Sequence, residues 1–172
     1  MMVKMIFETF GVAKLLIVMQ PVLDFRISGK TTGLVVNIGD EITQVVPIID
    51  GQPLLENAQT GSIAGKNIVY YFSKLLTYRG YSFTTQAEYE ILYDMKHKMS
   101  YVAFDVDEEE DDELIYELPD GQTICIGRER YLCSETLFDP SLYNDSGTNS
   151  EDSDSLQGMC VSAIMRCKPE AR

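Results

Sequence analysis

The sequence contains no tryptophan, a single histidine, His97, and four cysteines that share no C-x-x-C spacing. A structural zinc ion needs a set of cysteine and histidine ligands, so this composition excludes an ordinary zinc site. We therefore interpret Cys125, Cys133, Cys160 and Cys167 as ordinary thiols of a protein in a reducing compartment, and we expect an intracellular, cytoplasmic location.

Positive charge is also scarce, because 14 lysines and arginines stand against 27 acidic residues and the formal net charge is −13. A surface of that sign repels nucleic acid and anionic lipid, so we expect neither as a partner. The longest apolar run, 15–19, is far shorter than the roughly 20 residues that cross a bilayer, and residues 1–11 lack the pattern of a secretory signal. We predict no membrane span.

The composition is otherwise that of a globular protein, with 45% hydrophobic and 10% aromatic residues in a chain of 172. A domain of about 150 residues already buries roughly 68–70% of its unfolded surface, so one domain with a sizeable core is expected.

The first half of the chain alternates short strand and helix signals. The apolar run 15–19 predicts a strand buried on both faces, and Pro21 then predicts a short helix with Val22, Phe25 and Ile27 facing inward. Two β-branched runs, 33–38 and 41–49, flank Gly39-Asp40, which predicts a hairpin with a tight turn of positive φ. Pro47 indicates a position near an edge or a strand end, and Asp50-Gly51 predicts a further turn.

The second half begins with two amphipathic helices. Apolar residues recur at helical spacing from Lys66 to Arg79, and Thr85 with Glu88 forms a capping box before a helix that runs to about Met99. Residues 101–105 are typical of a strand. A second hairpin is predicted around Pro119-Asp-Gly, and a last helix should bury Met159, Ile164 and Met165. Residues 106–114 and 144–157, which are acidic or small and polar, predict mobile surface loops.

Several motifs occur in the order that actins have, and on them the chain resembles the actin family. They are Met5-Ile-Phe-Glu-Thr-Phe, Ser28-Gly-Lys-Thr-Thr-Gly, Val46-Pro-Ile, Thr77-Tyr-Arg-Gly-Tyr-Ser-Phe-Thr-Thr, Tyr101-Val-Ala, Tyr116-Glu-Leu-Pro-Asp-Gly-Gln and Ile164-Met-Arg-Cys.

The resemblance implies an α/β fold that is part of the actin-like ATPase (ribonuclease H-like) fold, a mixed sheet with flanking helices. Residues 1–32 would be a partial strand and helix of the first large domain with the hinge, and 33–172 would belong to the second large domain. The likeness covers a central stretch of an actin, so the first phosphate-binding loop and the segments that close over adenosine are expected to be missing.

The same resemblance places the turn 37–41 at the family's second phosphate-binding loop, with three changes from the usual residues. Asn37 stands for an aspartate near magnesium, Glu41 for a glycine beside phosphate, and Gln44 for a histidine near the hydrolytic water. Gln20 matches the glutamine that positions this water, although its place before Pro21 favours a helix cap. We therefore expect no catalytic residue and no metal site.

The resemblance leaves four candidate cofactor-binding residues, Gly39, Asp40, Gly65 and Lys96. Lys96 matches a lysine that contacts the nucleoside, whereas Tyr93 and His97 replace an arginine and a glutamate. Other interpretations remain open, because Gly65 could serve only as a helix cap and Tyr93, Lys96 and His97 could form the solvated face of a helix.

Three functions are compatible with these observations. The chain could be a divergent actin-like cytoskeletal or interaction protein that is not a competent ATPase alone, with actin or actin-binding proteins as partners. It could be an actin-fold protein that binds ATP with magnesium weakly and hydrolyses it weakly or not at all, or a truncated, non-functional actin fragment. The polar character of 143–155, where the family has an apolar loop between filament strands, argues against ordinary filament formation.

Overall fold

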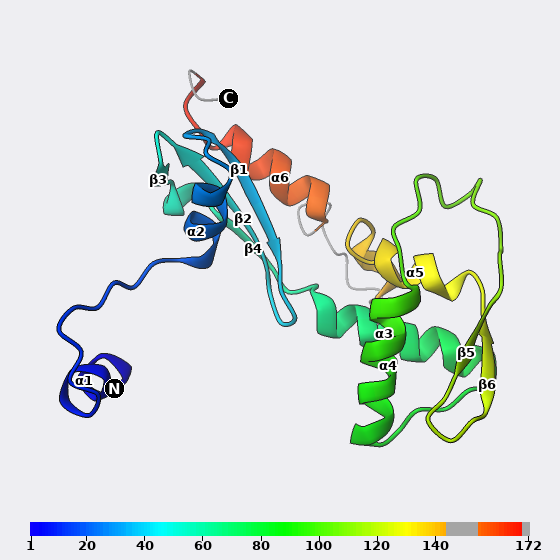
Figure 1. Ribbon diagram of the computed structural model, residues 1–172. Helices are drawn as coiled ribbons and strands as arrows, with labels where there is room; N and C mark the ends of the chain where they lie inside the picture. Colours follow the sequence, from blue (N-terminus) through cyan, green and yellow to red (C-terminus); the bar gives the residue numbers. More distant parts are fainter. Residues whose placement is uncertain (144–154, 170–172) are drawn as a thin grey trace.

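The sheet at one end of the molecule is built around the first predicted hairpin (Figure 1). We describe it from a computed structural model, in which the described residues are 1–143 and 155–169. The central strand β2 (Thr43–Ile49) pairs antiparallel with β1 (Gly33–Ile38) on one side and with two short strands, β3 (Gln52–Pro53) and β4 (Gln59–Gly61), on the other. The hairpin of β1 and β2 is therefore confirmed.

The two turns that flank β2 differ. Asp50 and Gly51 both have positive φ, 49° and 75°, as a two-residue hairpin requires, so this predicted turn is confirmed. The predicted tight turn at Gly39-Asp40 is wrong, because the connection is a four-residue loop that closes when the Gly39 N–H donates to the Ile42 carbonyl at 2.9 Å. Gly39 does not adopt positive φ there.

Pro47 lies in the central strand of the sheet, so the expected edge position is wrong, whereas the alternative of a position near a strand end fits, because β2 ends two residues later at Ile49. Its carbonyl accepts from the Leu54 N–H at 2.9 Å, which shows that its backbone polar groups face the β3 and β4 side. β4 pairs with β2 up to Val45 and β3 begins to pair at Ile48. The missing N–H of the proline therefore falls in the gap between these two strands, which a 3₁₀ turn (Leu55–Asn57) fills.

Helix α2 (Gln20–Ile27) covers one face of the sheet. Phe25 packs there against Val46 and Ile48, and all three side chains are buried. The predicted inward position of Ile27 is wrong, because this side chain is 86% exposed at the end of the helix.

Helix α6 (Leu156–Met165) covers the opposite face, where Met159 and Ala163 pack on Val45. A Cβ on Gly61 of β4 would lie 2.8 Å from the end of the Met159 side chain, so glycine leaves room for this methionine against the sheet. Of the side chains predicted to bury α6, Met159 does so, whereas Ile164 and Met165 are exposed.

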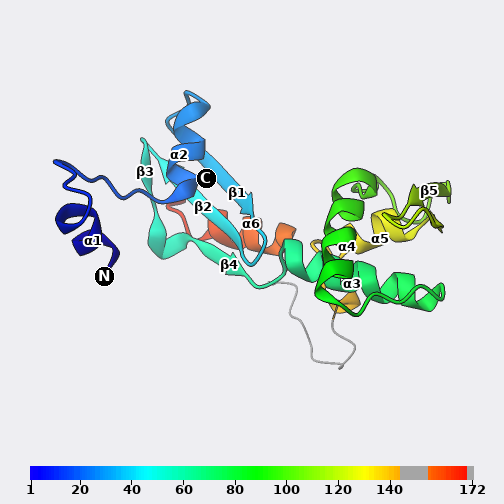
Figure 2. The ribbon, with the colours of Figure 1, turned by 60° about the horizontal axis from the view of Figure 1, so that its bottom comes forward.

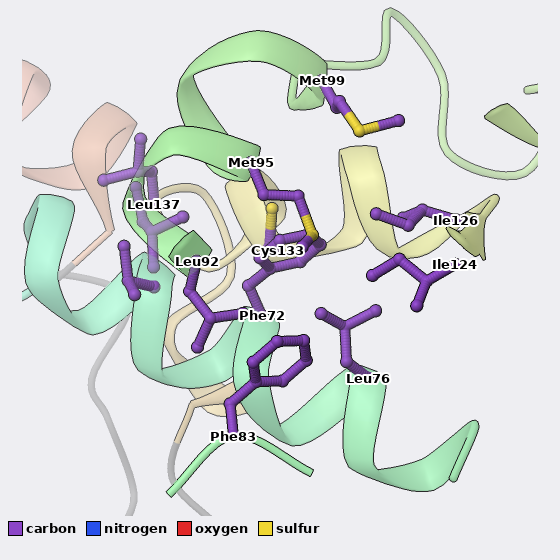
Figure 3. Packing of buried hydrophobic residues seen from close by; sticks show 12 residues of the cluster. Phe72, Leu76, Phe83, Leu92, Met95, Met99, Ile124, Ile126, Cys133 and Leu137 are labelled. Atoms are coloured by element: carbon purple, nitrogen blue, oxygen red, sulfur yellow. The ribbon is translucent and has the colours of Figure 1, made fainter. Parts of the chain in front are cut away.

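The largest hydrophobic core lies in a helical unit beside the sheet (Figure 3). It is formed by α3 (Gly65–Tyr78), α4 (Gln86–Met99), α5 (Glu129–Glu135), β5 (Leu114–Glu117) and β6 (Thr123–Ile126). Its buried members include Phe72, Leu76, Leu92, Met95, Ile126 and Cys133. Both helix predictions and the second hairpin are confirmed. A short 3₁₀ turn, Pro140–Leu142, follows α5.

The capping box at the start of α4 is also confirmed. The Thr85 hydroxyl accepts from the Glu88 N–H at 3.3 Å, and the Glu88 carboxylate accepts from the Thr85 N–H at 2.7 Å. The Thr84 N–H also donates to this carboxylate, and the Thr85 and Thr84 N–H groups stabilise its charged form, so they lower the pKa of Glu88.

Two predicted strands, 15–19 and 101–105, are absent. Leu16 is 79% exposed and Ile17 62% exposed in an extended segment that joins α2 to α1 (Met2–Glu8), a helix with no buried residue. Both views place α1 away from the sheet (Figure 2). Among the described residues no strand pairs with either segment. An apolar or β-branched run alone was therefore not sufficient to form a strand.

The loop predictions have mixed outcomes. Of the loop predicted at 106–114, residues 106–113 are outside helices and strands and mostly exposed, as expected for adjacent like charges. Its predicted last residue is wrong, because Leu114 begins β5. Of the loop predicted at 144–157, residues 144–154 lie outside the described part of the chain. The predicted end of this loop at residue 157 is wrong, because α6 begins at Leu156. Ser155 is the N-cap of this helix, and the Ser155 side chain accepts from the Gly158 N–H at 3.2 Å.

The α/β fold class is confirmed, with one difference from the expected mixed sheet: every strand pairing in the described residues is antiparallel. Within 1–143 and 155–169, no helix combines the length and the apolar character needed to span a bilayer. The division of the chain at residues 32 and 33 stays a prediction.

Replacing Leu92 by alanine should lower the free energy of unfolding by about 2–5 kcal/mol, because the fully buried side chain leaves a cavity in the largest core. Urea denaturation measures the change. Leu16→Ala removes the same atoms from a side chain that is 79% exposed, and it should change the value by less than about 0.5 kcal/mol. Equal losses in the two variants would contradict this placement of the core.

Stability at alkaline pH should depend on Tyr116, whose hydroxyl donates to the Asp94 carboxylate at 2.5 Å. Burial, and then this carboxylate, raise the pKa of Tyr116 to about 12. Between its ordinary pKa of 10.0 and about 12 the unfolded chain releases the proton and the folded chain keeps it, so stability is lost as pH rises through this range. Tyr116→Phe should flatten the fall in the free energy of unfolding, measured by urea denaturation at several pH values. Tyr78→Phe, at a side chain that is 75% exposed, should not.

Candidate functional site

The loop of residues 39–42 is attached to the first turn of α3. The Gly65 N–H donates to the Gly39 carbonyl at 2.9 Å, and the Lys66 N–H donates to the Asp40 carbonyl at 2.8 Å. The first N–H groups of a helix have no partner within the helix, and for that reason a helix start can bind phosphate. Here two of these groups are already bonded to the loop.

Gly65 therefore has a structural explanation. A Cβ at this position would lie 3.2 Å from the Gly39 carbonyl oxygen and 3.3 Å from the Asp40 Cα. Both are backbone atoms, so a side chain could be accommodated only if the loop moved. The helix cap that the sequence suggested is supplied instead by Asn67, whose side-chain oxygen accepts from the Ala64 N–H at 3.1 Å.

Lys96 reaches the same place from α4. Its Nζ donates to the Gly65 carbonyl at 3.3 Å and lies 5.3 Å from the centre of the Tyr93 ring. Burial lowers the pKa of Lys96, although Asp40 and Cys133 act in the opposite direction. The structure thus brings the four candidate residues Gly39, Asp40, Gly65 and Lys96 together, and it engages the lysine with protein backbone.

The other two positions on α4 differ from each other. Tyr93 is half-buried, and its pKa is raised first by burial and then by the nearby carboxylates of Asp40, Glu90 and Glu41. His97 is exposed. The alternative of a solvated helix face therefore describes His97 but not Tyr93.

Asn37 and Gln44 are direct neighbours across β1 and β2, so their side chains project from the same face of the sheet. Thr60 of β4 lies opposite Gln44 and extends this polar row. The row is on the face that α2 covers near Phe25, because Val46 and Gln44 are two residues apart on one strand. Both Asn37 and Gln44 are half-buried.

Gln20 is the first residue of α2, and the N-cap is Met19. The predicted cap role of Gln20 is therefore wrong, since the helix begins one residue earlier than Pro21. Its side chain is exposed.

A cleft of about 600 Å³ lies beside Asp40, between α3 and α4. Sequence reasoning identified two of its lining residues, Asp40 and Tyr93. It missed the others, which are Lys66, Val69, Tyr70, Gln86, Tyr89 and Glu90. A signal existed, because Lys66 and Tyr70, Gln86 and Glu90, and Tyr89 and Tyr93 are pairs four residues apart, and such pairs share a helix face.

These residues do not fit a magnesium triphosphate. Asp40 and Glu90 line the cleft, and Glu41 is close enough to affect the pKa of Tyr93, so anionic groups surround the position where further negative charge would sit. Two N–H groups at the start of α3, those of Gly65 and Lys66, already donate to carbonyl groups of the loop. No cluster of three or more histidine, cysteine or acidic side chains suited to a metal ion occurs in residues 1–143 and 155–169.

Replacing Gly65 by alanine should destabilise the protein even without any ligand. Crowding of the loop backbone costs about 1–3 kcal/mol, which outweighs the gain of up to about 1 kcal/mol in helix propensity. Urea denaturation of the ligand-free protein should show a net loss, and Ser62→Ala, at an exposed neighbour, should show almost none. Unchanged stability in Gly65→Ala would remove the structural explanation for this glycine.

The protein-family model described as Actin matches residues 1–172. This match spans the whole chain and agrees with the α/β arrangement of helices and antiparallel sheets seen in the structure. The protein belongs to the actin family.

Proposed function

We propose that this member of the actin family is a divergent actin-like cytoskeletal interaction protein, located in the cytoplasm, that is not a competent ATPase by itself. The observation that carries this proposal is the state of the loop 39–42. Its carbonyl groups occupy the first N–H groups of α3, and its exposed Glu41 adds a carboxylate where the family resemblance implies glycine.

The remaining parts of the site support the same proposal. Asn37 and Gln44 replace the aspartate and histidine that the resemblance implies near magnesium and water, which removes one charge and one proton acceptor. Lys96, the candidate contact to a nucleoside, donates to the Gly65 carbonyl. A ligand would have to compete with this bond.

Exposed apolar side chains support a docking function. Val36 and Ile38 on β1 are 42% and 41% exposed, and Val161 and Met165 on α6 are 56% and 59% exposed. Apolar surface of this kind is typical of interaction sites. We propose actin or actin-binding proteins as partners, and neither nucleic acid nor membrane, because the net charge is −13. Ordinary filament formation is not proposed.

The proposal predicts that Mg·ATP neither binds tightly nor is hydrolysed. A ligand present at 100 times its Kd stabilises a protein by about 2.7 kcal/mol, so even modest affinity would raise the melting temperature measurably. We expect no saturable shift on titration with Mg·ATP, whereas intact actin in the same assay should show one.

Phosphate release and sedimentation velocity complete this test. Turnover that requires magnesium and is lost in Gln20→Ala would contradict the proposal, and the variant separates genuine turnover from a contaminating ATPase. A saturable thermal shift without turnover would favour the ATP-binding alternative. A stable monomer with no affinity for actin would contradict the docking part.

A further inference from the structure

The cleft between α3 and α4 is lined by three tyrosines that the proposed function leaves unexplained. Tyr70 comes from α3, and Tyr89 and Tyr93 come from successive turns of α4. Tyr70 is 53% exposed, so its ring is accessible from solvent. The Tyr70 ring also contacts the ring of Tyr143 in an edge-on arrangement, with the two ring centres 5.8 Å apart.

The charges around these rings are mainly negative. Asp40 and Glu90 line the cleft, and Glu41 also affects the Tyr93 hydroxyl. Lys66 is a cation in the lining, so it offsets part of this charge. Lys96 lies near Tyr93 but donates to the Gly65 carbonyl. Two carboxylates and three aromatic rings thus line one small volume, and the carboxylate of Glu41 lies near it.

Two substitutions relative to the family pattern change the polarity of this place in the same direction. Where the resemblance implies glycine the chain has Glu41, and where it implies arginine the chain has Tyr93. The first adds a negative charge and the second removes a positive one. Both changes make the cleft less favourable for an anion and more favourable for a cation.

We propose that this cleft binds the guanidinium group of an arginine side chain presented by a protein partner. The inference rests on the proposed function and specifies the chemistry of its partner. A guanidinium is planar, stacks on aromatic faces and donates in a fork that matches carboxylates, and it is less strongly hydrated than an ammonium. The tyrosine rings supply the stacking surface, and Asp40 and Glu90 supply the acceptors. The volume of about 600 Å³ is in the range of side-chain and small-ligand sites.

The test uses the whole chain with ring-labelled tyrosine, followed by NMR, and N-acetyl-arginine amide as the probe. We expect saturable shifts of the ring signals of Tyr70, Tyr89 and Tyr93, which Tyr→Phe variants assign. N-acetyl-citrulline amide has nearly the same shape without the charge, so it should shift them much less. Raising the salt concentration should weaken the arginine effect, because exposed charges are screened.

Matched variants separate a specific site from a general attraction to an acidic protein. Glu90→Gln removes an exposed charge of the cleft and should weaken probe binding about two- to fivefold, the effect of one surface ion pair. Glu110→Gln removes an exposed charge elsewhere and should not. Tyr89→Leu should weaken binding further, whereas Tyr78→Leu should leave it unchanged.

Three results would overturn the inference. They are equal shifts of the ring signals with the arginine and citrulline probes, equal losses of probe affinity in Glu90→Gln and Glu110→Gln, or no saturable shift with the arginine probe. A titration of the same sample with Mg·ATP distinguishes this failure from that of the proposed function. Shifts of the same three tyrosines by Mg·ATP would contradict the proposed function as well. Absence of both effects would leave the proposed function in place and remove only the arginine site.

Discussion

The structure depends on two backbone hydrogen bonds that join the sheet to the helical unit. The loop 39–42 and the start of α3 each have polar groups that need partners, and the bonds of Gly65 and Lys66 to the carbonyl groups of Gly39 and Asp40 satisfy both. Glycine at position 65 suits this close approach, because a Cβ there would crowd the backbone of Gly39 and Asp40. The close approach also brings Asp40 to the cleft that α3 and α4 line.

This connection also restricts what the site can bind. A helix start with free N–H groups attracts anions, but donors bonded to neighbouring carbonyls contribute less to such a site. The carboxylates of Asp40 and Glu41 add negative charge near the same place, and burial makes the charge of Lys96 less favourable. The fold around this loop remains that of the actin family.

The parts of the fold that could be predicted are those with local causes. The capping box of Thr85 and Glu88 and the turn at Asp50-Gly51 involve residues close in sequence, so the sequence patterns were sufficient to predict both features. The strands expected at 15–19 and 101–105 failed for a different reason. An apolar or β-branched run shows that a segment is compatible with a strand, but pairing needs a neighbour, and nothing in the segment itself reveals whether one is present.

The candidate site was predicted in position but not in role. Resemblance located Gly39, Asp40, Gly65 and Lys96, yet the bonds that decide their roles join residues 26 and 31 positions apart. The tyrosine cleft was missed because each polar helix face, taken alone, looks solvated. The faces meet there because Phe72 of α3 and Leu92 of α4 are buried in one core, which fixes how the two helices turn toward each other. The burial that stabilises the helical unit therefore also creates the tyrosine cleft, and a pattern along one helix cannot contain that information.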